Sequence, residues 1–220
     1  WYWYNNLFAG IYRNDYGSFY KTTDNMYGLR DGDAKWGDFD NDGDMDVIIT
    51  ASAGTHRFFR NNLESNGGVL GAFTNITLGS GWDTNTSTNI DNIAYDFDND
   101  GRVDVLGGGG KIMFNQGNNV FAPVSYSGIS VGAVGDLNND GFLDFQNGNT
   151  IRYAVPNGNN WLKVNFQGIQ SNRNGIGARV EIYGPWGKQI RDVRSGEGFR
   201  YMSTLNAHFG LGTATTITQV

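Results

Sequence analysis

Three acidic windows of nine residues constrain this chain more than any other feature. They are Asp38–Asp46 (DFDNDGDMD), Asp96–Asp104 (DFDNDGRVD) and Asp136–Asp144 (DLNNDGFLD), with five, four and three Asp respectively, out of 22 acidic residues in the chain. Each window places oxygen-bearing side chains at positions 1, 3, 5 and 9 and a glycine at position 6. Carboxylates packed so closely repel one another, so a folded chain keeps them only when a cation compensates their charge.

The donor chemistry of the windows favours calcium. Only oxygen donors are offered, which suits Ca²⁺ and disfavours zinc and copper, whereas Mg²⁺ prefers fewer protein ligands and more water. The side chain at position 7 varies, which suits a ligand that is a backbone carbonyl. We therefore predict about three calcium sites. The predicted ligand positions are Asp38, Asp40, Asp42, Asp44, Asp46, Asp96, Asp98, Asp100, Arg102, Asp104, Asp136, Asn138, Asp140, Phe142 and Asp144.

Two other interpretations explain the windows less well. Asp, Asn and Gly dominate turns generally, but chance alone rarely gives three unrelated turns that match one nine-residue pattern. An EF-hand needs a bidentate Glu at position 12, where this chain has Ile49, Gly107 and Asn147. The segments after the windows are β-branched, apolar or glycine-rich, which predicts strands rather than helices.

The windows belong to an internal repeat. Phe58–Asn62 and Met113–Asn115 share an aromatic-then-Asn turn that a Phe follows, and Ile11–Asp15 shows the same turn without a window. We therefore expect residues 1–30 to be the back half of an incomplete repeat. The first and second windows lie farther apart than the second and third, because Asn/Thr/Gly-rich insertions occur between them around Glu64–Gly71 and Ser80–Asn89. A period near 40 residues with four short strands per unit is typical of propeller blades.

The segments Gly37–Asp46, Asp96–Asp104 and Gly135–Asp144 resemble the FG-GAP/VCBS family of calcium-binding propeller repeats, which also occur in integrin α-chains. The resemblance covers residues 1–156 and implies an all-β fold with a partial β-propeller of about three and a half blades. So few blades cannot close a ring. We expect either further blades before Trp1 or an open sheet edge covered by another chain or by the next domain.

Residues 157–220 have a different pattern, with more Lys and Arg and with alternating apolar and polar residues, which predicts a small antiparallel β-domain. They resemble the ASPIC/UnbV domain that often follows such repeats in secreted proteins. The resemblance rests on Asn160–Leu162, Asn172–Val180, Gly196–Gly198 and His208–Gly212. The family usually continues beyond the last residue here, so we expect a truncated C-terminus.

Composition excludes several classes of function. The chain has no cysteine, which excludes disulfide scaffolds, thiol nucleophiles, cysteine-ligated zinc and iron–sulfur clusters. The longest strongly apolar stretch is about four residues, far short of the roughly 20 that cross a bilayer. Three calcium ions would bring the formal net charge of −6 to about zero, so charge gives no argument for a nucleic-acid partner.

Catalysis and sugar binding have weaker support in the sequence. His56 and His208 are the only histidines, and we predict packing or structural hydrogen bonds for both. Glu181 and Glu197 would be a carboxylate pair for glycoside hydrolysis, but nothing in the sequence brings them together. We predict that the chain is not an enzyme.

Tryptophans with polar or glycine neighbours in the sequence would be exposed and could stack on sugars, whereas two others are expected in the core. The exposed set is Trp1, Trp3, Trp82 and Trp186, and the core set is Trp36 and Trp161.

The function predicted from these patterns is calcium-stabilised binding or adhesion through protein–protein or protein–glycan contacts. Calcium loops in extracellular modules bind with Kd of about 10⁻⁴ to 10⁻³ M, which is useful only where calcium is millimolar. This favours an extracellular or cell-surface location, with the periplasm as an alternative. The other functions considered are a structural subunit of a surface or filamentous assembly, joined through the open sheet edge, and a polysaccharide-acting enzyme.

Overall fold

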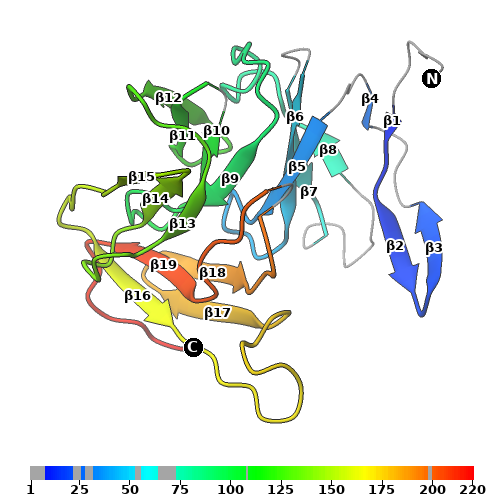
Figure 1. Ribbon diagram of the computed structural model, residues 1–220. Helices are drawn as coiled ribbons and strands as arrows, with labels where there is room; N and C mark the ends of the chain where they lie inside the picture. Colours follow the sequence, from blue (N-terminus) through cyan, green and yellow to red (C-terminus); the bar gives the residue numbers. More distant parts are fainter. Residues whose placement is uncertain are drawn as a thin grey trace.

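The computed structural model describes residues 8–21, 26–27, 32–52, 56–63, 73–107, 109–197 and 200–220. These residues form short antiparallel sheets, and none of the sheets closes into a barrel (Figure 1). The strands are short because turns of Gly, Asn and Asp interrupt them at regular intervals. Within the described part of the chain, no helix has the length and apolar character needed to cross a membrane.

Two four-stranded sheets and one three-stranded sheet follow one another as blades. Blade 1 consists of β5 (Gly32–Gly37), β6 (Asp46–Ala51), β7 (Arg57–Asn61) and β8 (Phe73–Asn75). Blade 2 consists of β9 (Asn92–Tyr95), β10 (Asp104–Gly107), β11 (Lys111–Asn115) and β12 (Phe121–Ser125). Blade 3 consists of β13 (Ala133–Gly135), β14 (Asp144–Asn147) and β15 (Thr150–Arg152). The fold class predicted from the sequence, an all-β partial propeller with a small β-domain, is confirmed.

The strands before blade 1 form two separate pairs. Strand β1 (Phe8–Ala9) pairs with β4 (Met26–Tyr27), and β2 (Tyr12–Asp15) forms a hairpin with β3 (Ser18–Lys21). The hairpin turns at Tyr16 and Gly17, both with positive φ, which is the backbone twist that suits a two-residue hairpin loop. The hairpin extends away from the blades (Figure 1).

The strand register repeats along the chain. In each blade the residue before the acidic window pairs with the last Asp of that window, so the window is the loop between the first two strands. These pairs are Gly37 with Asp46, Tyr95 with Asp104, and Gly135 with Asp144. In three hairpins, the Asn of the aromatic-then-Asn turn pairs across the hairpin with a Phe of the next strand. These pairs are Asn14 with Phe19, Asn61 with Phe73, and Asn115 with Phe121.

Two apolar cores lie between the blades. The core between blades 1 and 2 contains Phe39, Ile48, Phe58, Trp82, Ala94, Val103, Val105, Met113 and Phe121. The core between blades 2 and 3 contains Ile93, Phe97, Leu106, Ile112, Val131, Val134, Leu143 and Phe145. Each core is filled from one face of one blade and the opposite face of the next, so alternating strand residues point into different cores.

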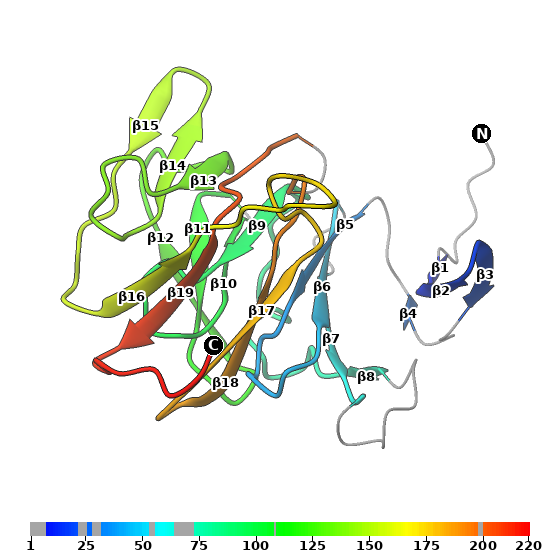
Figure 2. The ribbon, with the colours of Figure 1, turned by 90° about the horizontal axis from the view of Figure 1, so that it is seen from below.

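The part of the chain from β16 (Asn160–Val164) to β19 (Ala207–Gly212), called the C-terminal unit below, packs across one end of the blades (Figures 1 and 2). Strand β16 (Asn160–Val164) pairs with β19 (Ala207–Gly212), and β17 (Arg179–Gly184) pairs with β18 (Gly187–Asp192). The two strand pairs share a core of their own. It contains Val180, Ile182, Ala207, Phe209 and Leu211.

The tryptophans differ from expectation at two positions. Trp82 is 1% exposed, because its glycine-rich loop folds back between blades 1 and 2, where the indole meets Phe121 edge-on with ring centroids 5.7 Å apart. Trp161 is 39% exposed, so it is not the core residue that the sequence predicts. Trp36 and Trp186 are both half-buried against apolar clusters. Trp1, Trp3 and Glu64–Gly71 lie outside the described residues.

Candidate metal centre

The three acidic loops share one backbone conformation. The Asn at position 4 has a φ near +60° in each loop, and the Gly at position 6 also has a positive φ. The values are Asn41 59°, Asn99 59° and Asn139 60°, with Gly43 96°, Gly101 95° and Gly141 84°. Asn and Gly are the residues that adopt this region most readily, so the Asn–Asp–Gly sequence dictates the turn. The role of the position-4 Asn was not predicted, although the same residue stands there in every loop.

The side chain of the first Asp of each loop is buried and faces the loop interior. One carboxylate oxygen accepts a hydrogen bond from the position-6 amide: Asp38 Oδ2 from Gly43 at 3.2 Å, Asp96 Oδ2 from Gly101 at 2.8 Å, and Asp136 Oδ2 from Gly141 at 3.2 Å. The Oδ1 atoms of Asp38 and Asp136 are buried without a hydrogen-bond partner. For Asp38 such an oxygen indicates a missing positive partner, whereas the Asp136 carboxylate already accepts from Lys163 Nζ through Oδ2 at 2.7 Å.

Positions 3 and 5 have a simpler role in loop geometry. Each side chain accepts a hydrogen bond through Oδ1 from the backbone amide two residues later, which forms successive Asx turns. The residues are Asp40, Asp42, Asp98, Asp100, Asn138 and Asp140. These bonds use one oxygen of each side chain, which leaves the second carboxylate oxygen of each Asp for another partner.

The position-9 Asp is the most deeply placed and joins the loop to two strands. Asp104 accepts hydrogen bonds from the amides of Phe97 at 2.9 Å and Asn115 at 2.8 Å. Asp46 and Asp144 make the equivalent pair of bonds. These carboxylates therefore stabilise the blade, whether or not they also bind metal.

Position 7 was predicted to contribute its carbonyl, and its side chains point to different surroundings. Asp44 and Phe142 are buried, and Arg102 pairs with Asp100. The Arg102 Nε also donates to the Asn115 carbonyl at 2.8 Å. Metal binding by the position-7 carbonyls stays a prediction.

Acidic side chains converge in two of the three loops. One carboxylate oxygen from each member of a group lies within 4.8 Å of the others, and the groups are Asp38, Asp40, Asp42 and Asp96, Asp98, Asp104. Burial raises the pKa of Asp38 to about 7, helped by the charges of Asp42 and Asp40 and opposed by Arg191. Burial also raises the pKa of Asp96 to about 7 and that of Asp46 to about 8. Since loss of water disfavours these anions, an oxygen-coordinated cation fits the first two loops.

The C-terminal unit covers all three loops at their position-6 glycines. A Cβ on Gly43 would lie 1.8 Å from Lys188 Nζ, one on Gly101 would lie 2.9 Å from Gln189 Nε2, and one on Gly141 would lie 1.8 Å from the Trp161 ring. Glycine is therefore required at Gly141 for close approach as well as for positive φ, whereas at Gly43 the flexible end of Lys188 could move aside and the positive φ is the stronger reason. No feature of the local sequence predicts this contact, because it joins residues far apart in the chain.

Hydrogen bonds reinforce the contact at the second loop. The Gly210 amide donates to Asp96 Oδ2 at 3.2 Å, and the Gly212 amide donates to the Asn99 carbonyl at 2.8 Å. The His208 ring bonds through Nε2 to Asn99 Oδ1 at 2.7 Å. Asn99 also donates through Nδ2 to the Gly141 carbonyl at 3.0 Å, so it joins the second loop to the third loop and to β19. His208 thus has the structural hydrogen bond that the sequence analysis expected.

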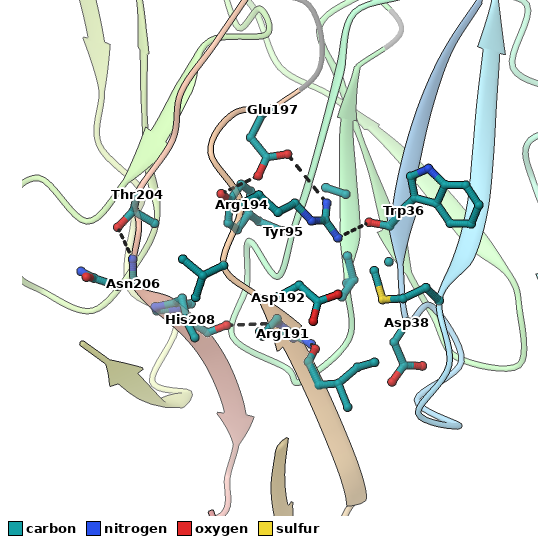
Figure 3. A pocket seen from close by; sticks show the side chains of 17 residues that line it. Trp36, Asp38, Tyr95, Arg191, Asp192, Arg194, Glu197, Thr204, Asn206 and His208 are labelled. Atoms are coloured by element: carbon teal, nitrogen blue, oxygen red, sulfur yellow. Dashed lines mark hydrogen bonds and ion pairs between the residues drawn. The ribbon is translucent and has the colours of Figure 1, made fainter. Parts of the chain in front are cut away.

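A small cavity of about 50 Å³ lies where β18 and β19 meet β5 and β9. Figure 3 shows its polar residues turned toward one another. The Arg194 guanidinium donates to the Trp36 carbonyl at 2.8 Å, and Glu197 accepts from the Tyr95 hydroxyl at 2.9 Å. The Arg191 Nε donates to the His208 carbonyl at 3.1 Å. These groups satisfy one another and hold the C-terminal unit to the blades, so the cavity is a structural junction.

The carboxylates considered for glycoside hydrolysis have separate partners. Glu197 belongs to the junction just described, whereas Glu181 accepts from the Tyr183 hydroxyl at 2.9 Å. His56, the second histidine, is buried beside Trp82 and accepts from the Ala51 amide through Nδ1 at 3.2 Å. The contacts of Glu181 and His56, like those of Glu197, are therefore structural.

Comparison with known families agrees with the two kinds of structure described. No curated protein is similar enough in sequence to count as a relative. Residues 38–107, which include the first two acidic loops, match the FG-GAP-like repeat. Residues 168–220, which include β17, β18 and β19, match the ASPIC and UnbV family. The chain therefore has a segment similar to an FG-GAP-like repeat and, after it, a segment similar to the ASPIC and UnbV family.

Proposed function

We propose that this chain is an extracellular binding or adhesion protein whose blade loops are stabilised by calcium, as in VCBS-type repeats. The observation that carries the proposal is the convergence of buried carboxylates in the first two loops, where Asp38 Oδ1 has no hydrogen-bond partner. In the same proposal, residues 1–156 are the blade domain and residues 157–220 are the C-terminal domain. FG-GAP-like repeats are typical of extracellular proteins and form a non-catalytic fold, which favours binding over turnover.

Calcium, when bound, would supply positive charge where the chain concentrates negative charge. The residues best placed to hold it are Asp38, Asp40 and Asp42 in the first loop and Asp96, Asp98 and Asp104 in the second. The chain itself shapes the loops, through Asx turns and the positive-φ Asn and Gly. Bound metal would therefore stabilise loops that are already formed, together with the C-terminal domain that packs on them.

The expected affinity connects the site to a location. With Kd of about 10⁻⁴ to 10⁻³ M, such loops would be filled outside cells and empty at the low calcium levels inside. At free calcium tenfold above Kd, each occupied loop would add about 1.4 kcal/mol to the free energy of unfolding. In a chain of this size, that corresponds to a rise in Tm of about 3–6 °C per site.

The test is thermal unfolding of the full chain in chelator and in about 2 mM calcium. We compare wild type with Asp98→Asn, which keeps the Asx turn and removes a charge, and with Asp83→Asn as control. Asp83 also accepts amide hydrogen bonds, from Gly79 and Gly81, but lies outside the acidic loops. We expect calcium to raise the Tm of wild type and Asp83→Asn, and to raise that of Asp98→Asn less. A wild-type Tm that calcium leaves unchanged would refute calcium binding.

The partner is proposed to be an extracellular protein or a glycan. Exposed rings on the β2–β3 hairpin, including Tyr12, Phe19 and Tyr20, offer contact area for either. Binding to panels of polysaccharides and matrix proteins, measured in calcium and in chelator, tests the adhesion function. Turnover of a polysaccharide that a substitution outside the acidic loops abolishes would instead favour an enzyme.

A second candidate function is a structural subunit of a surface assembly. Blade 3 has three strands, and in the described part of the chain no strand pairs with the outer edge of β15. Ile151, Tyr153 and Val155 along this segment are exposed, and an open edge with apolar side chains can pair with another chain. Oligomers that grow with protein concentration in sedimentation velocity would support this function, and a strictly monomeric protein would exclude it.

A further inference from the structure

We propose that Lys163 is a permanent internal cation of the third loop, so that the chain binds two calcium ions rather than three. The first and second loops bind the two ions, and the third loop holds its shape through the lysine instead of metal. This inference rests on the proposed calcium binding and assigns different roles to loops that look alike in sequence.

Lys163 is held firmly at the position-1 carboxylate. It comes from β16, and its Nζ lies 2.7 Å from Asp136 Oδ2. The lysine side chain is 19% exposed and that of Asp136 is 3% exposed, so solvent screens the pair weakly. The ammonium also lies 5.7 Å from the centre of the Trp161 ring, close enough for a cation–π contact. Trp161 in turn lies directly on Gly141 of the same loop.

The other polar groups of the third loop are matched to donors from the protein. Asn138 replaces the Asp found at position 3 of the other loops, and its Nδ2 donates to Asp140 Oδ2 at 2.8 Å. Asp144 accepts from the amides of Leu137 and Ala154. One oxygen, Asp136 Oδ1, has no hydrogen-bond partner, but the carboxylate to which it belongs is already paired with the Lys163 charge.

The first loop contrasts with the third at the equivalent carboxylate. Asp38 also has a buried Oδ1 without a hydrogen-bond partner, but its carboxylate lies in a convergent group with Asp40 and Asp42. Lys188 of the C-terminal unit also reaches this loop, with its Nζ against Gly43 at position 6, and Arg191 donates to the carbonyls of His208 and Ile190. The first loop has five Asp against that one lysine, and three of the five still converge, so it keeps excess negative charge for an added ion.

The second loop has an internal cation of a different kind. Arg102 pairs with Asp100 at position 5, and its side chain is 38% exposed. This pair lies at the rim and leaves Asp96, Asp98 and Asp104 as a convergent group. Arg102 therefore reduces the loop's charge without occupying its centre, whereas Lys163 pairs with the position-1 carboxylate of the third loop.

Calcium in the third loop would have to displace the ammonium from Asp136. That would leave a lysine beside an indole without its counter-ion, and breaking a partly buried ion pair is costly. We therefore expect the third loop to bind calcium more than about 100-fold more weakly than the other two.

The experiment is to count bound calcium by equilibrium dialysis and isothermal titration calorimetry on the chelator-stripped full chain. We expect two ions for wild type and three for Lys163→Met, which removes the charge and keeps a side chain of similar length. Lys111→Met is the control, because Lys111 begins β11 at the end of blade 2 opposite the acidic loop, and it should bind two. Circular dichroism checks that each variant is folded.

The outcomes separate this inference from the proposed function. No bound calcium at all would refute the proposed function. Three ions in wild type, or two in folded Lys163→Met, would overturn the role of Lys163 and leave calcium binding intact. If Lys163→Met does not fold, Asp136→Asn and Asp96→Asn replace it. We then expect Asp136→Asn to keep two ions and Asp96→Asn to lose one, and loss of an ion in Asp136→Asn would overturn the inference.

Discussion

Replacing Asn99 with alanine should destabilise this protein more than any other single change at position 4 of an acidic loop. Asn99 is buried, with a φ of 59°, and its amide group contacts two other parts of the chain. Its Nδ2 donates to the Gly141 carbonyl, so its Oδ1 must be the acceptor for His208 Nε2–H. Alanine would remove both partners at once and leave a buried carbonyl and a buried imidazole N–H without hydrogen bonds.

The magnitude follows from these losses. Each buried group left unsatisfied costs about 1–3 kcal/mol, so the two together cost about 2–6 kcal/mol. The left-handed backbone conformation adds about 1 kcal/mol for alanine compared with asparagine. We therefore expect the free energy of unfolding to fall by about 3–7 kcal/mol, a large share of the 5–15 kcal/mol typical of a folded domain.

Asn139 provides a matched control for this prediction. It occupies position 4 of the third loop with a φ of 60°, and it is exposed. Asn139→Ala should therefore show the backbone cost alone, about 1 kcal/mol. The assay is urea denaturation of wild type and both variants at one fixed calcium concentration. If Asn99→Ala is no less stable than Asn139→Ala, the hydrogen bonds between the loops and β19 contribute nothing measurable, and the reasoning fails.

Three further predictions concern single sites. Burial, followed by the charge of Arg191, lowers the pKa of His208 to about 4. Between about pH 6.5 and 4 the unfolded chain therefore binds a proton that the folded chain does not, and stability should fall by about 3 kcal/mol across that window. Urea midpoints at pH 7.5 and 4.5 should differ less for His208→Gln than for wild type, and equal pH dependence would contradict this role. Gly141→Ala should lower the urea midpoint well below that of Gly148→Ala, because its Cβ would meet an indole whereas the Cβ of Gly148→Ala would meet open space; similar midpoints would argue against the contact. Trp82→Ala should cost about 3–5 kcal/mol by opening a cavity between blades 1 and 2, and a cost below about 1 kcal/mol in the same assay would show that the indole is not buried.

The parts of the fold that the sequence predicts are those with local causes. The Asp–x–Asp/Asn–x–Asp–Gly pattern determines its own turn, because the Asx bonds and the left-handed Asn and Gly lie within nine residues. The β-branched residues after each loop form strands, and the spacing of the loops gives the period of the blades. These features allowed the all-β fold and the strand after each loop to be predicted without knowledge of long-range contacts.

The features that sequence reasoning missed depend on residues far apart in the chain. Trp82 lies among Gly, Ser and Asp, so its neighbours suggest exposure, whereas its burial comes from Phe121 and other residues of blade 2. Trp161 lies in an alternating strand, so its neighbours suggest a core position, whereas its ring covers Gly141 of the third loop. In both cases the exposure of the ring is decided by a partner at least 20 residues away.

The acidic loops have two roles: they concentrate negative charge, and they hold the blades and the C-terminal unit together. Asn41 donates to the Gly101 carbonyl at 3.2 Å and Asn99 donates to the Gly141 carbonyl at 3.0 Å, so each loop contacts the next. The C-terminal unit then covers the same loops with Lys188, Gln189 and Trp161, which removes water from their carboxylates. Burial makes negative charge more costly, so the contact that orders the loops also raises their need for positive charge. Because both roles fall on the same residues, supplying cations to the loops should strengthen the packing between blades and the attachment of the C-terminal unit together.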